Sequence, residues 1–351
     1  MKHLQLEQSM IEALNKQLPA TEAKKYEIRY FYFKNKLNDQ VLEWIRTAEG
    51  SLTDHGPKHI ENLLDNVYRL ISPELSKVAN GETNSCLSGI DIYLLATTVL
   101  FHDVGNIFGR DKHNLTIMQI MNDIFLSDFQ DIHKREKNLI FRAAKAHTGK
   151  GDDLTADTLK DIQRLEQLNG HQVALQDIAA IVRFADELAE GPQRTSSYAQ
   201  HIKLFAPSSE IYHRYASTLD VHIDPKNERI SLAYEIEVST DANCQISMEQ
   251  EEKLKLFLNY IYERIHKLDA ERKYCSFYCD LLKPIRKTVA NFSFVNNGFP
   301  VDFKIEPLTL NDLVIPKKFL SKAEEIASPH GREDLNAERL ITQLKLHLAK
   351  S

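Results

Sequence analysis

The chain has 351 residues, of which 42% are hydrophobic and 27% charged, so its composition is that of a globular protein and excludes a disordered one. Its formal net charge of −6 argues against a protein that coats long nucleic acid by bulk electrostatics, although local basic patches remain compatible with it. The four cysteines show no CxxC spacing, and no apolar run reaches the roughly 20 residues of a membrane span, so we expect a cytoplasmic protein without membrane contact.

Apolar residues recur at helical spacing through most of the first 200 positions. Loops rich in Gly, Asn, Ser and Asp, such as 76–89 and 148–158, separate these segments. The pattern therefore predicts an all-α core in the N-terminal two thirds. The expected helices span 5–17, 35–48, 57–72, 90–106, 112–127, 134–147 and 174–190.

The hydrophobic period changes near residue 216. Residues 220–223 and 229–238 are β-prone and flank the turn-forming sequence DPKNE, which predicts a hairpin. A second extended pair is expected within 292–310, around the residues NNG. The remaining C-terminal helices are expected over 248–268, 271–290 and 333–349. The predicted fold class is thus mainly α, with a smaller α+β C-terminal portion that contains β-hairpins.

The stretch LFHDVGN places two ionisable side chains, His102 and Asp103, at the end of an otherwise apolar helix. Such groups are costly to bury alone, so a hydrogen-bond network or a cation must hold them. Other imidazoles and carboxylates also fall on apolar helix faces or at helix ends and are expected to point inward. They are His55, His113, His147 and Asp186. This set suggests a metal site, because a mixture of imidazoles and carboxylates without thiolates favours a borderline divalent cation over calcium.

The order of His55, the doublet His102-Asp103 and a distant Asp186 in RFADELAEG resembles the H…HD…D signature of the HD superfamily of metal-dependent phosphohydrolases. The resemblance covers roughly residues 35–200. It implies an HD-type helical bundle that hydrolyses phosphate esters, commonly those of nucleotides, cyclic nucleotides or nucleic acids. The additional histidines in TDHGPKHI, HDVGNIFGRDKH and AHTGKG resemble the branch that binds a second metal, which includes HD-GYP phosphodiesterases and HD domains of bacterial conflict systems.

Carried over to this sequence, the resemblance implies one or two divalent cations, drawn from Mn, Fe, Co, Ni, Zn and Mg. The ligands it implies for the first cation are His55, His102, Asp103 and Asp186. For the second cation it implies His113 and His147, with Asp103 bridging. In a single-metal enzyme these two histidines would instead bind phosphate. Two departures limit the resemblance: Asn106 takes the place of the lysine in the common HDIGK motif, and there is no GYP tripeptide.

A basic run at 133–151 supplies cations that do not titrate, and it forms either a substrate funnel or a solvated helix face. Lys150, between two glycines, and Arg110, shortly after the doublet, are the favoured phosphate contacts. Lys58 and His59 are the second choices. We therefore expect Asp103, Lys150 and Arg110 to be the catalytic residues.

The function predicted is hydrolysis of a nucleotide or of a cyclic or oligomeric nucleotide by metal-activated water. Two alternatives stay open: a nuclease of single-stranded nucleic acid, which could serve phage defence, and a non-hydrolysing nucleotide sensor. The domains expected are a helical extension at 1–34, the HD domain at 35–214, an α+β portion at 215–315 and a charged helical tail at 316–351. The C-terminal portion could cover the site, supply substrate selectivity, form a homo-oligomer or bind a protein partner, and its composition does not choose among these roles.

Overall fold

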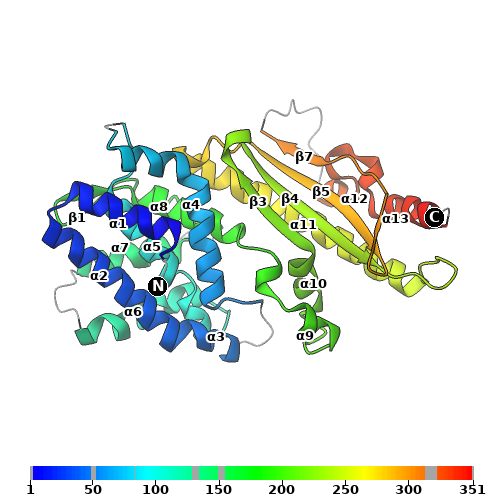
Figure 1. Cartoon of the computed structure of the whole chain (residues 1–351), viewed down its shortest axis with the longest axis horizontal. Coiled ribbons are helices and arrows are strands. Elements are labelled where there is room, and N and C mark those ends of the chain that lie inside the picture. The colour runs from blue at the N-terminus through cyan, green and yellow to red at the C-terminus, as the bar shows by residue number, and fades with distance from the viewer. Residues whose placement is uncertain are drawn as a thin grey trace. The chain divides into compact units, whose positions relative to one another are not determined.

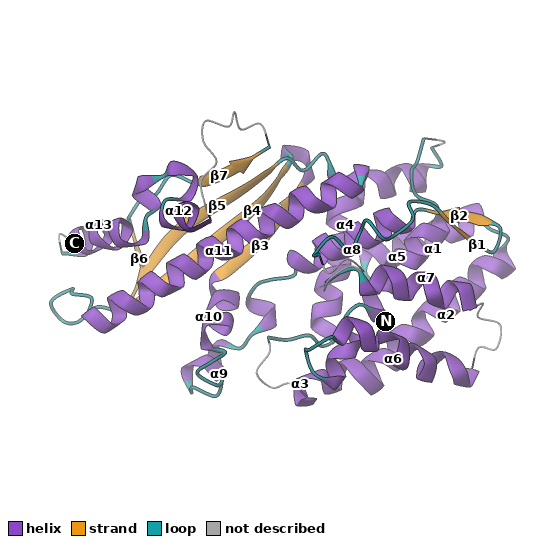
Figure 2. Cartoon of the chain, turned by 180° about the vertical axis from the view of Figure 1, so that it is seen from behind, coloured by secondary structure: helices purple, strands orange, loops and turns teal. Residues whose placement is uncertain are grey.

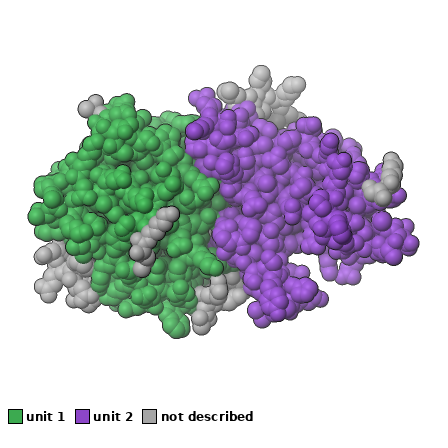
Figure 3. Space-filling view, in the orientation of Figure 1, with its two compact units in different colours: residues 1–189, 272–284 green, residues 190–271, 285–351 purple. Residues whose placement is uncertain are grey.

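The computed structural model describes residues 3–48, 53–82, 84–128, 134–148, 155–312 and 322–349. Two compact units divide the chain (Figure 3): unit 1 contains residues 1–189 and 272–284, and unit 2 contains the rest. Helices make up most of unit 1, whereas the longer strands belong to unit 2 (Figure 1, Figure 2). The protein is therefore mainly α with a smaller α+β part, which confirms the predicted fold class. The expected domain boundaries after residues 34 and 214 fall within helices of these units.

Helix α5 (Gly89–Phe101) is the centre of unit 1. All of its residues are buried, and it contacts α1, α2, α4, α7 and α8, as a helix that is apolar on every side must. Its start is fixed by a capping box, in which the Ser88 hydroxyl accepts a bond from the Asp91 N–H and the Asp91 carboxylate accepts one from the Ser88 N–H. The other helices of this unit are α1 (Gln5–Gln17), α2 (Ala20–Leu37), α3 (Glu43–Ala48), α4 (Pro57–Asn80), α6 (His113–Asp128), α7 (Lys134–Lys145) and α8 (Leu175–Glu187).

A buried polar cluster joins three of these helices. The guanidinium of Arg29 on α2 donates from Nη1 to Oε2 of Glu136 on α7, at 2.6 Å. Tyr93 on α5 donates its hydroxyl to Oε1 of the same carboxylate, also at 2.6 Å. Burial raises the pKa of Tyr93 well above its usual value, and the negative charge of Glu136 adds to this effect. We call these three residues the structural cluster, because each of them is paired within the protein.

Three features of unit 1 differ from the prediction. Helix α2 was not expected, although Tyr26, Tyr30, Phe33 and Leu37 form a buried stripe along it. Helix α4 continues through Pro73 to Asn80, where the left-handed Gly81 (φ +71°) ends it, so the predicted end at residue 72 was wrong. A short antiparallel pair, β1 (Glu166–Leu168) and β2 (His171–Val173), also forms inside the region predicted to be entirely α.

Unit 2 is built on a five-stranded sheet in the order β3-β4-β5-β6, with β7 paired to the same edge of β5 as β6. The hairpin of β3 (Leu219–Asp224) and β4 (Arg229–Val238) confirms the first predicted hairpin. Strands β4 and β5 are parallel, and α11 belongs to the crossover between them. The remaining elements are β5 (Lys287–Asn296), β6 (Phe299–Val301), β7 (Leu308–Asn311), α9 (Ser197–His201), α10 (Glu210–Thr218), α11 (Met248–Tyr278), α12 (Lys322–Ala327) and α13 (Ala337–Leu348).

The two helices predicted over 248–268 and 271–290 are one continuous helix, α11. No glycine or proline interrupts residues 248–278, so nothing in the sequence breaks the helix before Cys279. Residues 287–296 are instead a strand, because KTVANFSFVN is rich in β-branched and aromatic residues. Within unit 2 the helix packs on the sheet: the rings of Tyr262 and Phe292 meet edge to face, and Thr288 donates to Asp269 at 2.9 Å.

Among the described residues, no individual helix combines the length and apolar character needed to cross a membrane. Gly89–Phe108 and His113–Ile124 meet those requirements only together, as a pair bent by 106°.

Candidate metal centre

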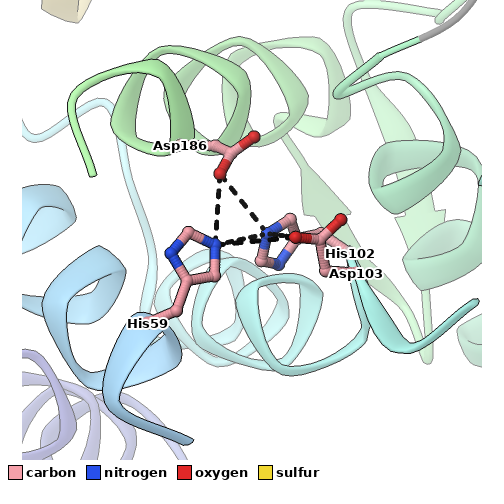
Figure 4. A group of neighbouring side chains, drawn as sticks. All are labelled: His59, His102, Asp103 and Asp186. Carbon is pink, nitrogen blue, oxygen red and sulfur yellow. Dashed lines mark hydrogen bonds and ion pairs between the residues drawn. The ribbon is translucent and has the colours of Figure 1, made fainter. Parts of the chain in front are cut away.

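Six side chains that are far apart in the sequence meet inside unit 1. His59 lies on α4, His102 and Asp103 directly follow α5, His113 begins α6, His147 follows α7, and Asp186 lies near the end of α8. Their ligand atoms form two groups, each with all atoms within 4.8 Å of one another. The first group is His59, His102, Asp103 and Asp186 (Figure 4). The second group is Asp103, His113 and His147.

Asp103 belongs to both groups because its two carboxylate oxygens face in different directions. Its Oδ2 atom lies 3.4 Å from Nε2 of His102 and 3.6 Å from Nε2 of His59. Its Oδ1 atom lies 3.2 Å from Nε2 of His113 and 3.4 Å from Nε2 of His147. One carboxylate thus links both sets of imidazoles.

Three of the histidines are oriented in the same way. The Nδ1 atoms of His102, His113 and His147 lie 2.6–3.0 Å from the backbone carbonyl of the residue three positions earlier. A carbonyl only accepts, so each Nδ1 carries the proton and donates it. Each ring therefore directs Nε2 to the centre, which is the arrangement that metal-binding histidines use.

The electrostatics of the centre follow from burial and from close opposite charges. Burial alone would lower the pKa of His102, but Asp103 and Asp186 outweigh it and raise the pKa of His102 to about 10. Burial alone would raise the pKa of both carboxyl groups, whereas the surrounding histidines hold each pKa well below its usual range. The pKa of His147 is lowered by burial, so this ring is neutral at pH 7. In the absence of a cation, the His102 proton compensates part of the buried negative charge.

The residues present fit a divalent cation. Nε2 of His59 lies 3.4 Å from Nε2 of His102, and Nε2 of His113 lies 3.2 Å from Nε2 of His147. His113 and His147 both donate from Nδ1 to the backbone, so in their neutral forms they oppose lone pair to lone pair and cannot satisfy each other. Around a cation with bonds of about 2.1 Å, tetrahedral ligand atoms lie roughly 3.4 Å apart. Within the first group, the separations that involve Nε2 of His59 or His102 are 3.3–3.6 Å and match that spacing.

The backbone between Asp103 and α6 makes this arrangement possible. The 3-10 helix η2 (Val104–Phe108) contacts α6, and a methyl group added to Gly105 would overlap the carbonyl oxygen of His113 and the hydroxyl of Thr116. Only glycine therefore lets His113 approach Asp103. Asn106, which replaces the lysine of the common motif, is fully buried and does not reach solvent.

A buried side chain, Asn66, also fixes the backbone beside Asp186. Asn66 on α4 donates from Nδ2 to the carbonyl oxygen of Ala185, at 3.2 Å, and so holds the residue that precedes this ligand. The Asp186 side chain is 26% exposed, whereas those of His59 and His102 are inaccessible to solvent. The first group therefore opens to solvent at Asp186.

His55 and His59 occupy different places from those the sequence suggested. His59, predicted as a second-choice phosphate contact, lies in the first group. His55, predicted as a ligand, lies beside that group, with Nδ1 3.1 Å from Oδ2 of Asp103 and Nε2 3.2 Å from Nη1 of Arg110. Because arginine only donates, His55 accepts at Nε2 and donates from Nδ1 to Asp103. His55 precedes α4, whereas His59 lies on the buried face of α4 with Leu63. The spacing of four residues between His59 and Leu63 was the signal in the sequence that could have identified His59 as inward-facing.

Of the other predicted phosphate contacts, Arg110 and Lys58 lie within the described residues. Arg110 is exposed beside His55, and Lys58 is exposed at the start of α4. Lys150 lies outside the described residues. Within the basic run, Arg135 and Arg142 both pair with Glu166 of β1, so these two cations stabilise the packing of α7 against the β1–β2 pair.

The comparisons with known proteins agree with this geometry. The family model HD-CE matches residues 49–267, a span that contains all six residues of the two groups and more than half of the chain. Neither the curated proteins nor the solved structures include a match. With its HD-type domain and its His/Asp cluster, the chain belongs to the HD-CE family.

Proposed function

We propose that this protein is a metal-dependent hydrolase of phosphate esters and that its substrate is a nucleotide or a cyclic or oligomeric nucleotide. The observation that carries the proposal is the carboxylate of Asp103, whose two oxygens serve two groups of inward-facing imidazoles. Two cations that share a carboxylate are a recurrent solution for phosphoryl chemistry. The finer resemblance to HD-GYP and conflict-system domains stays a prediction.

The first cation would be held by His59, His102, Asp103 and Asp186, and the second by His113 and His147 together with Asp103. Bound divalent cations would supply an activated water molecule and positive charge for the phosphate oxygens. The chain's own contribution is to fix the ligands: the Nδ1–H bonds to backbone carbonyls orient three of the rings, and the ends of five helices set the separations.

Arg110 is suited to hold the substrate phosphate. Its exposed guanidinium donates to His55, which in turn donates to Asp103, so this cation is linked to the centre through one imidazole. A guanidinium has five N–H donors and keeps its charge at every physiological pH. We infer that the remaining donors of Arg110 contact phosphate oxygens and offset the charge that develops on them.

Two exposed aromatic rings support a nucleotide substrate. Phe108 ends η2, the turn that directly follows Asp103, and its side chain is 54% exposed. Trp44, on α3, is 55% exposed, and α3 contacts η2. Exposed aromatic rings beside a phosphate site bind nucleobases by stacking, at about 1–3 kcal/mol per base.

The experiment combines elemental analysis with a panel of substrates: nucleoside phosphates, cyclic mono- and dinucleotides, and single-stranded DNA. The wild-type protein is expected to bind two divalent cations and to hydrolyse at least one class. Asp103→Asn is expected to lose both cations and turnover while its circular dichroism spectrum stays unchanged. Asp65→Asn, which alters an exposed carboxylate on α4, is the matched control and is expected to behave like wild type.

Two results would contradict the proposal. Unchanged metal content in Asp103→Asn would show that this carboxylate does not hold the cations. A metal-loaded wild-type protein that hydrolyses none of the substrates would instead favour the sensor. Hydrolysis of single-stranded DNA alone would select the nuclease among the phosphate-ester substrates.

A further inference from the structure

The backbone that precedes His147 is held by two buried side chains. The hydroxyl of Thr158 donates to the carbonyl oxygen of Ala146, at 2.7 Å. Arg183 donates from Nη1 to the Thr158 hydroxyl, at 2.8 Å, and to the Ala146 carbonyl, at 3.5 Å. Thr158, Arg183 and His147 are each less than 9% exposed. The peptide that leads into His147 of the second group is thus fixed by two side chains outside that group.

The last turns of α11, which belong to unit 1, complete this arrangement. The ring of Tyr274 lies beneath the Arg183 guanidinium, 4.6 Å from its central carbon. The Tyr274 hydroxyl accepts from the N–H of Leu159, at 3.0 Å, and donates to the carboxylate of Asp157, at 2.9 Å. The residues on both sides of Thr158 are therefore attached to α11.

Arg183 also has a defined relation to the first group. It lies on α8 three residues before Asp186, so one helix supplies a ligand of the first group and restrains the backbone beside a ligand of the second. Burying a permanent charge is costly, and the contacts of Arg183 with Thr158, two backbone carbonyls and an aromatic face offset that cost. These contacts fix the orientation of the Arg183 guanidinium, which in turn restrains the Ala146 carbonyl.

We propose that Arg183 and Thr158 are positioning residues that place His147 and thereby set the affinity of the second group for its cation. The inference rests on the proposed function, because it requires two cations. Both residues act through the Ala146 carbonyl. Loss of an outer partner that orients a ligand typically lowers metal affinity by about 10–100-fold.

The test is a titration of the full-length, metal-free protein with Mn²⁺. Calorimetry measures the heat of each binding step, and electron paramagnetic resonance measures the concentration of free Mn²⁺. Thr158→Val keeps the shape of the side chain and removes the hydroxyl. We expect its first binding step to equal that of wild type and its second step to be weaker by at least about tenfold. Thr97→Val is the matched control, because the buried Thr97 hydroxyl also donates to a backbone carbonyl at 2.7 Å, but within α5. Its two steps are expected to be those of wild type.

A second variant covers the case in which Thr158→Val does not fold. Tyr274→Phe keeps the ring beneath Arg183 and removes the bonds to Leu159 and Asp157, so we expect a smaller weakening of the same second step. The inference is overturned if the second step is unchanged in the folded variants, or if Thr97→Val weakens it equally. A wild-type protein that binds fewer than two Mn²⁺ ions would overturn the two-cation proposal itself, which separates the two failures.

Discussion

The structural cluster and the candidate metal centre are both buried polar groups of unit 1, yet they differ in how their hydrogen bonds are satisfied. In the structural cluster, the Glu136 carboxylate receives one bond from Arg29 and one from Tyr93, so donors meet acceptors. In the metal centre, the Nε2 atoms of His113 and His147 face each other across 3.2 Å, and both Nδ1–H groups are directed to the backbone. Both oxygens of the Glu136 carboxylate thus have a donor, whereas the second arrangement places one imidazole acceptor opposite another.

This difference gives a physical criterion for telling a packing interaction from a ligand site. A buried ion pair whose members satisfy each other stabilises the fold and needs nothing from outside. A cluster in which acceptor faces acceptor is unfavourable until a cation arrives, and it persists because the surrounding helices hold it. The three predictions below test that criterion, starting with the largest expected effect.

Breaking the structural cluster should cost the most. Arg29→Met leaves the Glu136 charge buried without its guanidinium, so we expect the free energy of unfolding to fall by about 3–5 kcal/mol. Urea denaturation of the metal-free protein measures this change. Lys253→Met, which breaks an exposed pair with Glu249 on α11, is the control and should leave the unfolding midpoint unchanged. A midpoint for Arg29→Met equal to that of wild type would show that the cluster is not stabilising.

Removing single imidazoles should separate ligands from their neighbours. His59→Ala is expected to lower the affinity for the first cation by more than about 100-fold, because it removes a ligand atom of that group. His55→Ala should lower it by only about 10–100-fold, because His55 orients Asp103 through a hydrogen bond. Competition with a metallochromic chelator measures both values. The reverse order would make His55 the ligand and His59 its neighbour.

The pH dependence should have opposite signs for metal affinity and for the stability of the metal-free protein. The pKa of His102 is raised to about 10, so a cation must displace its proton, and affinity should rise by about tenfold per pH unit between pH 7 and 9. A pKa raised above 6.5 contributes stability that is complete below pH 6.5 and is lost as the pH rises through 10. The metal-free protein should therefore unfold more readily at pH 10 than at pH 7.

Calorimetry in buffers with different ionisation enthalpies counts the protons released on binding, and urea denaturation follows the stability. His102→Gln is expected to remove the slope of the stability curve between pH 7 and 10. An affinity that does not change with pH would mean that His102 is already neutral in the metal-free protein.

Much of the candidate site could be predicted from the sequence. The doublet His102-Asp103 is visible because ionisable residues interrupt an apolar helix, and Asp186 because it ends an apolar stripe. His59 was underestimated because the helix start at Pro57, which separates it from His55, is uncertain by a few residues in any sequence pattern. The partners of Arg29 and Arg183 could not be predicted, since Glu136 and Thr158 meet them only through tertiary packing.

The same difference between local pattern and tertiary packing explains which parts of the fold could be predicted. The local hairpin of β3 and β4 could be predicted because its turn and both arms are contiguous. The parallel pairing of Arg229 with Lys287 joins residues on either side of α11, and periodicity carries no information about which distant strands pair. Where the sequence suggested a break near residue 270, the helix continued, because no residue there disfavours it.

Helix α11 imposes a constraint on how this chain can change in evolution. Tyr262 packs on Phe292 of the sheet, and Asp269, seven residues later, accepts a bond from Thr288 of the same strand. Each residue of an α-helix adds about 100° of rotation, so one inserted or deleted residue between them turns one of the two side chains away from the sheet. Changes in length should therefore be tolerated in the loops of unit 2 but not within residues 262–269 of α11.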